Sequence, residues 1–137
     1  MKSLVLKNKI EELPQLEAFV EELADEYALD PALCFNLNLV LEELATNVAL
    51  YAFPKDEEHD FLITADKNDG NLVLHIVDDG VPFNPVEEAP EVDVTLGAED
   101  REIGGLGIFL VQQLMDKVEY ERTDDGKNVL TLVKKIA

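Results

Sequence analysis

The segment Leu39–Phe53, LVLEELATNVALYAF, most constrains what this chain can fold into. At helical spacing it carries one apolar stripe suited to a protein core. The stripe is formed by Val40, Leu41, Leu44, Val48 and Tyr51. Glu43 and Asn47 lie four residues apart, one turn of helix, on a neighbouring face. An acid and an amide together on an apolar helix indicate a solvated edge, a side-chain hydrogen bond or a polar ligand.

The limits of this central helix can also be predicted. Asp30 is suited to cap its N-terminus, and Pro31 is suited to the first helical position, where a missing N–H is tolerated. Pro54 and the charged run Lys55–Asp60 end it. We therefore expect the helix to run from Pro31 to about Phe53.

The other segments alternate between helical and strand patterns. We expect an edge strand at Ser3–Leu6, an amphipathic helix at Ile10–Leu29 with Pro14 in its first turn, strands at Phe61–Ala65 and Leu72–Val77 around a hairpin turn at Asn68–Asn71, a helix at Ile108–Val118, and strands at Val118–Arg122 and Val129–Ile136 joined by Asp124–Lys127. This order predicts an α+β fold, a two-layer sandwich with helices on one face of a mixed, mostly antiparallel sheet. It also predicts a single domain over residues 1–137.

The charge limits the possible ligands. The chain has 30 acidic and 11 basic residues and a net charge of −19. Such a surface repels nucleic acid and anionic membranes, because phosphate contacts need Lys and Arg. A phosphorylated ligand would therefore have to be neutralised by backbone N–H groups, a helix dipole and a metal.

Cysteine and histidine usage argues against an internal disulfide and against a zinc site. Cys34 is the single cysteine, so no internal disulfide can form. His59 and His75 are isolated from it and from each other in the sequence, which argues against zinc. We find no signal peptide and no apolar run of membrane length, and so expect a cytoplasmic protein.

A second polar site follows the strand that ends at Val77. The run Asp78–Phe83 reads DDGVPF, and Asp-Gly after a strand is ordinary turn chemistry. An Asp at a strand end can also accept a hydrogen bond from the exocyclic amine of a base. Gly80 would then let the backbone approach a flat ring closely.

A third site is the glycine run Gly104, Gly105, Leu106 and Gly107 before an apolar helix. Glycines there leave the free N–H groups of the helix open to phosphate, although a flexible joint would have the same composition. Residues 81–103 contain three prolines and no sustained period. A connection of this length is often a lid or binding loop, and the alternative is a disordered insert.

Other nucleotide-binding motifs are missing. There is no GxxxxGK[ST] run, and Gly105 and Gly107 lack the third glycine of the dinucleotide fingerprint. The HRD and DFG elements of eukaryotic-type protein kinases are also absent.

Together the three sites match one family. In order they are ELATN on a helix, DDGVPFNP after a strand and GGLGIFL opening the next helix. The set resembles the GHKL ATPase/kinase superfamily, which has the Bergerat ATP-binding fold. It is most similar to the small stand-alone anti-sigma-factor serine/threonine kinases of the RsbW and SpoIIAB type, and the resemblance covers nearly the whole chain.

The resemblance implies a role for each matching residue. Asn47 would bind the Mg²⁺ that bridges the ATP phosphates, and Glu43 would act as general base toward an attacking hydroxyl. Asp78 would accept the adenine amino group, with Gly80 beside the ring.

The resemblance also implies phosphate contacts and a lid. The ATP lid would span Pro82–Ile103, with Pro82 and Phe83 at its start. Gly104, Gly105, Leu106 and Gly107 would form the phosphate-binding run, in which Gly105 and Gly107 present their N–H groups. Arg101 would meet the terminal phosphate, or else be a solvated charge beside Glu99 and Asp100.

Three functions fit the sequence. The preferred one is an ATP-dependent serine/threonine kinase of a partner-switching system. It would phosphorylate a STAS-domain anti-anti-sigma antagonist, bind a sigma factor and form a homodimer, without direct contact to nucleic acid or membrane. The second is a non-catalytic nucleotide-binding module that sequesters a partner, and such a module does not need Glu43. The third is a structural domain in which the motifs are coincidental.

Overall fold

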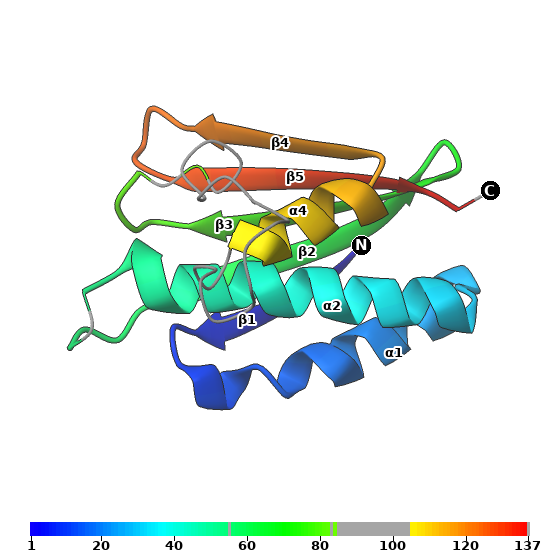
Figure 1. The fold of residues 1–137 in the computed structure, drawn as a ribbon, viewed down its shortest axis with the longest axis horizontal. Helices are drawn as coiled ribbons and strands as arrows, with labels where there is room; N and C mark the ends of the chain where they lie inside the picture. Colours follow the sequence, from blue (N-terminus) through cyan, green and yellow to red (C-terminus); the bar gives the residue numbers. More distant parts are fainter. Residues whose placement is uncertain (55, 83, 85–104, 137) are drawn as a thin grey trace, which may run out of the picture.

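The computed structural model describes residues 1–54, 56–82, 84 and 105–136 of the chain. They form two layers, a five-stranded sheet and helices on one of its faces (Figure 1). The elements are β1 (Lys2–Lys7), a 3₁₀ turn (Ile10–Glu12), α1 (Gln15–Tyr27), α2 (Pro31–Asn47), a π-helix (Val48–Ala52), β2 (Asp60–Asn68), β3 (Asn71–Asp78), α4 (Gly105–Leu114), β4 (Lys117–Arg122) and β5 (Asn128–Lys135). The α+β, two-layer prediction is confirmed.

The sheet has the strand order β1-β2-β3-β5-β4, and every pairing among the described residues is antiparallel. The predicted hairpin turn joins β2 to β3, with positive φ angles of 50° at Asp69 and 79° at Gly70. Two positive φ angles suit the right-handed twist of the flanking strands. The β3–β5 register places Asp78 directly opposite Asn128.

The first helix begins later than predicted. Ile10–Glu12 form a 3₁₀ turn, and α1 starts only at Gln15, after Pro14. Proline fixes φ and lacks an N–H, so Pro14 caps the helix instead of lying inside it. The expected amphipathic character is confirmed, because Leu16, Phe19, Val20 and Leu23 are buried, whereas Ile10 is exposed.

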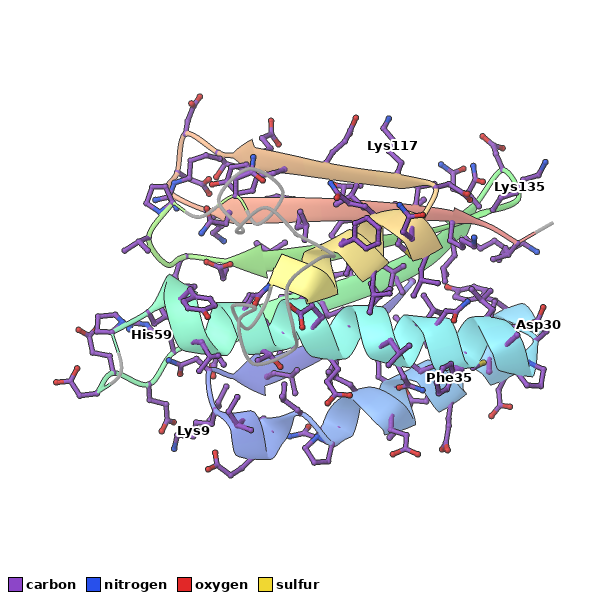
Figure 2. The ribbon with its side chains drawn as sticks, viewed as in Figure 1. Lys9, Asp30, Phe35, His59, Lys117 and Lys135 are labelled. Atoms are coloured by element: carbon purple, nitrogen blue, oxygen red, sulfur yellow. The ribbon has the colours of Figure 1, made fainter. Side chains whose placement is uncertain are left out.

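The central helix begins where predicted. The Asp30 side chain accepts a hydrogen bond from the Leu33 N–H at 2.8 Å, which caps the helix. Figure 2 shows Asp30 at this end of α2. The predicted core face is confirmed at Val40, Leu41, Leu44 and Val48, all buried.

Tyr51 was placed on that core face wrongly, because it is 44% exposed. The helix changes to a π-helix at Val48, and the wider turn rotates the following side chains out of the predicted register. Ala52 and Phe53 are buried instead.

By length and composition alone, the 22 residues Pro31–Ala52 could cross a membrane, although the sequence analysis found no such run. In the structure the apolar residues of this segment have a different use. Leu37, Leu41 and Leu44 are buried in the common core with the strands. Core packing accounts for part of the hydropathy of this helix, while Phe35, Leu39 and Leu50 on the same segment are exposed.

The last helix is displaced from its predicted limits of Ile108–Val118. It begins at Gly105 and ends at Leu114, and Val118 already belongs to β4. The Asp116 N–H donates to the Val133 carbonyl oxygen of β5 at 2.9 Å, so the backbone pairs with the sheet directly after the helix. Val111 and Met115 are buried.

The ends of several helices and strands lie together at one end of the molecule (Figure 1). There β3 ends, β5 begins, α2 runs into its π-helix, and the N-terminal end of α4 points the same way. Lys117 and Lys135 lie at the opposite end of the sheet (Figure 2). The fold therefore gathers the predicted polar sites away from these two basic residues.

Candidate functional site

A small pocket lies where β3 ends and β5 begins, against the C-terminal part of α2. This Asp78 pocket is lined by Leu44, Asn47, Val48, Ala52, Ile76, Asp78, Tyr120, Asn128 and Leu130. Apolar walls with a few polar groups are typical of small-molecule sites. The pocket has a volume of about 30 Å³.

Asp78 is the charged group of this pocket. Its carboxylate is buried and accepts hydrogen bonds from the Gly80 N–H and from Asn128 Nδ2, both at 2.9 Å. Burial raises the pKa of Asp78 above its usual range, and the two hydrogen bonds oppose this shift. Both bonds reach Oδ1, so Oδ2 accepts none from the described residues and is available to a ligand donor.

The sequence analysis did not place Asn128 in the site, yet it is buried beside Asp78. Its Oδ1 accepts from the Tyr120 hydroxyl at 2.5 Å and from Arg122 Nη1 at 3.3 Å. The alternation of β4 puts Tyr120 and Arg122 on one face. The sequence signal was a polar residue at the first position of a buried strand. That signal does not identify Asp78 as its partner, because the pairing depends on the register of β3 with β5.

Gly80 has a packing role as well as the predicted one. A Cβ at Gly80 would lie 2.2 Å from the Ala52 carbonyl oxygen. The next residue, Val81, donates its N–H to the same oxygen at 2.9 Å. The turn after β3 is therefore seated against the π-helix, where no side chain fits. Approach of a ring to Gly80 stays a prediction.

Glu43 lines a second, larger cavity between α2 and α4, the Glu43 groove, of about 250 Å³. Its other lining residues are Leu39, Val40, Glu42, Thr46, Leu110, Val111 and Leu114. Burial raises the pKa of Glu43, a hydrogen bond from Asn47 opposes this, and the Glu42 charge adds to it. Glu43 Oε1 is buried and has no hydrogen-bond partner among the described residues. A buried acceptor without a partner is costly and fits a ligand-facing group.

Asn47 connects the two cavities, since it lines the Asp78 pocket and lies one turn from Glu43, whose pKa it helps to lower. Within the described part of the chain, no group of three or more His, Cys, Asp or Glu side chains could hold a metal. Magnesium does not require such a cage, because it commonly takes one or two protein ligands together with phosphate oxygens and waters. The Asn47 carboxamide oxygen fits that use.

The phosphate-binding run is described in part. Gly105, Leu106 and Gly107 lie in the first turn of α4, not before it as predicted. The first four N–H groups of a helix have no partner inside it, so this position still suits an anion. Among the described residues that line the two cavities, none is Lys or Arg.

Of the remaining predicted site residues, the structure describes only Pro82. Pro82 is exposed at the end of the described turn. Phe83, Arg101, Gly104 and nearly all of the predicted lid lie outside the described residues. Their roles stay predictions.

Known proteins with similar sequences include two curated kinases. Serine/threonine-protein kinase BtrW of Bordetella bronchiseptica is 28% identical over 114 residues, which cover 83% of this chain and 79% of BtrW. Serine-protein kinase RsbW of Listeria monocytogenes is 31% identical over 98 residues, which cover 69% of this chain and 62% of RsbW. The chain thus spans less than two thirds of RsbW.

A solved structure and a family model agree with the fold. The crystal structure of RsbU and RsbW domains from Mycobacterium tuberculosis superposes with a TM-score of 0.66 at 15% identity, over 98% of this chain and 32% of that one. The family model described as "Histidine kinase-like ATPase domain" matches residues 6–134. The chain therefore belongs to the histidine kinase-like ATPase domain family.

Proposed function

We propose that this protein is an ATP-dependent serine/threonine protein kinase of a partner-switching system. Its substrate is a serine or threonine hydroxyl on a STAS-domain antagonist, and its cofactor is ATP with Mg²⁺. The family supports the use of ATP, and the two curated relatives are named as kinases. The order of the three motifs supports the finer assignment to the anti-sigma type.

The observation that carries the proposal is the buried Oε1 of Glu43 in the Glu43 groove, which has no hydrogen-bond partner in the described part of the chain. A protein that only binds a nucleotide has no use for this carboxylate. A kinase uses it to accept the proton of the attacking hydroxyl. The raised pKa of Glu43 favours this role, because a base is most effective when its pKa approaches the working pH.

The other residues supply binding and orientation. Asp78 accepts a hydrogen bond from the base, Asn47 binds the magnesium ion, and the N-terminus of α4 faces the phosphates. Phosphoryl transfer depends mainly on such positioning and on neutralisation of charge. Held by Asn47, a magnesium ion would supply the positive charge that neutralises and polarises the phosphates. In the transfer, the hydroxyl oxygen gains a bond to the terminal phosphorus, and the bond from that phosphorus to ADP breaks.

The proposal has a regulatory half. The same protein binds and inhibits a sigma factor, acts as a homodimer in the cytoplasm, and exchanges partners according to whether ATP or ADP is bound. Its acidic surface, with a net charge of −19, is consistent with regulation through proteins and not through direct contact with DNA.

Labelled ATP tests the catalytic half. The protein is incubated with γ-labelled ATP, Mg²⁺ and STAS-domain proteins encoded near its gene, and each candidate is compared with a version whose target serine or threonine is alanine. We expect label on the hydroxyl residue of one antagonist. Tight ATP binding without transfer to any antagonist would instead support the non-catalytic binding module. Co-elution with a sigma factor in gel filtration tests the regulatory half.

A further inference from the structure

Asn128 ties the last strand of the sheet to the turn that carries Asp78. Its Nδ2 donates to Asp78 Oδ1 at 2.9 Å and to the Val81 carbonyl oxygen at 2.8 Å. Its Oδ1 accepts from the Tyr120 hydroxyl and from Arg122 Nη1. One side chain thus contacts the buried carboxylate, the turn and the edge strand.

These neighbours determine the orientation of the Asn128 amide. A guanidinium can only donate, whereas an ionised carboxylate and a backbone carbonyl can only accept. A flipped amide would set its oxygen against two acceptors and its NH₂ against the donor Arg122. The NH₂ group is therefore committed to Asp78 and Val81.

The fixed orientation of the Asn128 amide also restrains the Asp78 carboxylate. The Gly80 N–H and Asn128 Nδ2 both donate to Oδ1, and two donors on one oxygen hold the rotation of the carboxylate. Arg122 Nη1 also donates to the Gly80 carbonyl oxygen at 2.8 Å. The turn is thus held at two successive carbonyls, by Arg122 at Gly80 and by Asn128 at Val81.

We propose that Asn128 is a positioning residue for base recognition, which holds the Asp78 carboxylate so that Oδ2 accepts from the 6-amino group of adenine. The inference rests on the proposed use of ATP. Arg122, on the edge strand, also helps to hold Asp78 in place, because it donates hydrogen bonds to Asn128 Oδ1 and to the Gly80 carbonyl oxygen. A purely structural cross-link would stabilise the sheet without favouring one base over another.

Two nucleotides separate these possibilities. ATP and purine riboside 5′-triphosphate differ only in the 6-amino group, so their affinity ratio reports the contact with Asp78. Both are titrated by calorimetry in the presence of Mg²⁺ into the wild type and Asn128→Ala. The matched control is Asn38→Ala, which removes an amide that donates to the Cys34 carbonyl oxygen on α2.

We expect the wild type to prefer ATP. Asn128→Ala should bind ATP about tenfold more weakly, because one hydrogen bond to a charged group loses its geometry, and should bind purine riboside triphosphate within about twofold of wild type. Asn38→Ala should change neither affinity. Arg122→Met alters an exposed side chain and serves if Asn128→Ala does not fold; it should weaken ATP selectively, by a smaller factor.

Equal weakening of both nucleotides, or no weakening of either, would overturn the inference while leaving ATP binding intact. A wild type without preference for ATP would also overturn it. A wild type that binds neither nucleotide would refute the use of ATP and this inference together. Selective loss in a protein that phosphorylates no antagonist would refute the proposed kinase and uphold the role of Asn128.

Discussion

Replacing Glu43 with glutamine removes a proton acceptor while keeping the shape of the side chain. Glu43 Oε1 is buried in a groove lined by α2 and α4 and has no hydrogen-bond partner in the part of the chain that the structure describes. Asp78 and Asn47 stay in place in this variant. We therefore expect Glu43→Gln to bind ATP within about twofold of wild type and to lose transfer to the antagonist.

The magnitude follows from the role of a general base. Such a group contributes a factor of about 10² to 10⁴ to the rate, and each tenfold step corresponds to about 1.4 kcal/mol. Burial, which raises the pKa of Glu43, makes the carboxylate a stronger base than one in water. We therefore expect a loss of at least about 100-fold in single-turnover transfer.

Stability provides a second measurement on the same variant. Because the pKa of folded Glu43 is raised above its unfolded value, the folded protein holds more protons in the window between the two. Stability from this group is therefore lost as the pH rises through that window. Glu43→Gln should unfold at a higher temperature than wild type at neutral pH, and the difference should vanish in acid.

Glu42→Gln is the matched control, since it makes the same charge change at an adjacent exposed position. Glu42 also lines the groove, but one step along a helix turns a side chain by about 100°, so the two carboxylates leave α2 in different directions. Single-turnover transfer is measured for both variants at saturating ATP. Transfer by Glu43→Gln within about threefold of wild type, or a loss confined to Glu42→Gln, would refute the assignment of the base.

Four further outcomes follow. Asn47→Ala should abolish magnesium-dependent ATP binding in calorimetry, while any binding without Mg²⁺ should be unchanged. Gly80→Ala should lower the denaturant midpoint, by about 1–3 kcal/mol of unfolding free energy, because its Cβ would lie 2.2 Å from the Ala52 carbonyl oxygen. Asp78→Asn should weaken ATP binding yet raise the melting temperature at pH 8, and this gain should disappear in acid, because burial raises the pKa of Asp78 and stability falls as the pH rises through the shifted range. Arg101→Ala should slow transfer without changing ATP affinity; an unchanged transfer rate would mean that this arginine is only a solvated charge.

Local patterns predicted much of the fold because local geometry controls them. The cap at Asp30, the buried face of the central helix and the Asn68–Asn71 turn each depend on residues within a few positions. The four-residue separation of Glu43 and Asn47 becomes a contact through helical pitch alone. The three motifs were therefore recognisable in order without knowledge of the packing.

Misjudged positions show where local patterns stop being sufficient. Tyr51 fits the helical stripe, but the π-helix from Val48 turns it outward. Gly105 and Gly107 look like a loop before a helix, yet they form its first turn. Propensity alone does not decide such cases, because the cost of glycine in a helix is only about 1 kcal/mol per residue and tertiary context can outweigh it.

The sequence alone determined the elements, the order of the motifs and the acid–amide pair, because each is set by spacing along one segment. Only the tertiary structure decided that Asp78 meets Asn128, 50 residues away, and that Gly80 lies against Ala52. These contacts depend on the register of β3 with β5 and on how α2 crosses the sheet. A slip of one residue in the register would move every side chain of a strand to the other face of the sheet. The positions of Asp78 and Asn128 are therefore set by the pairing of the whole sheet.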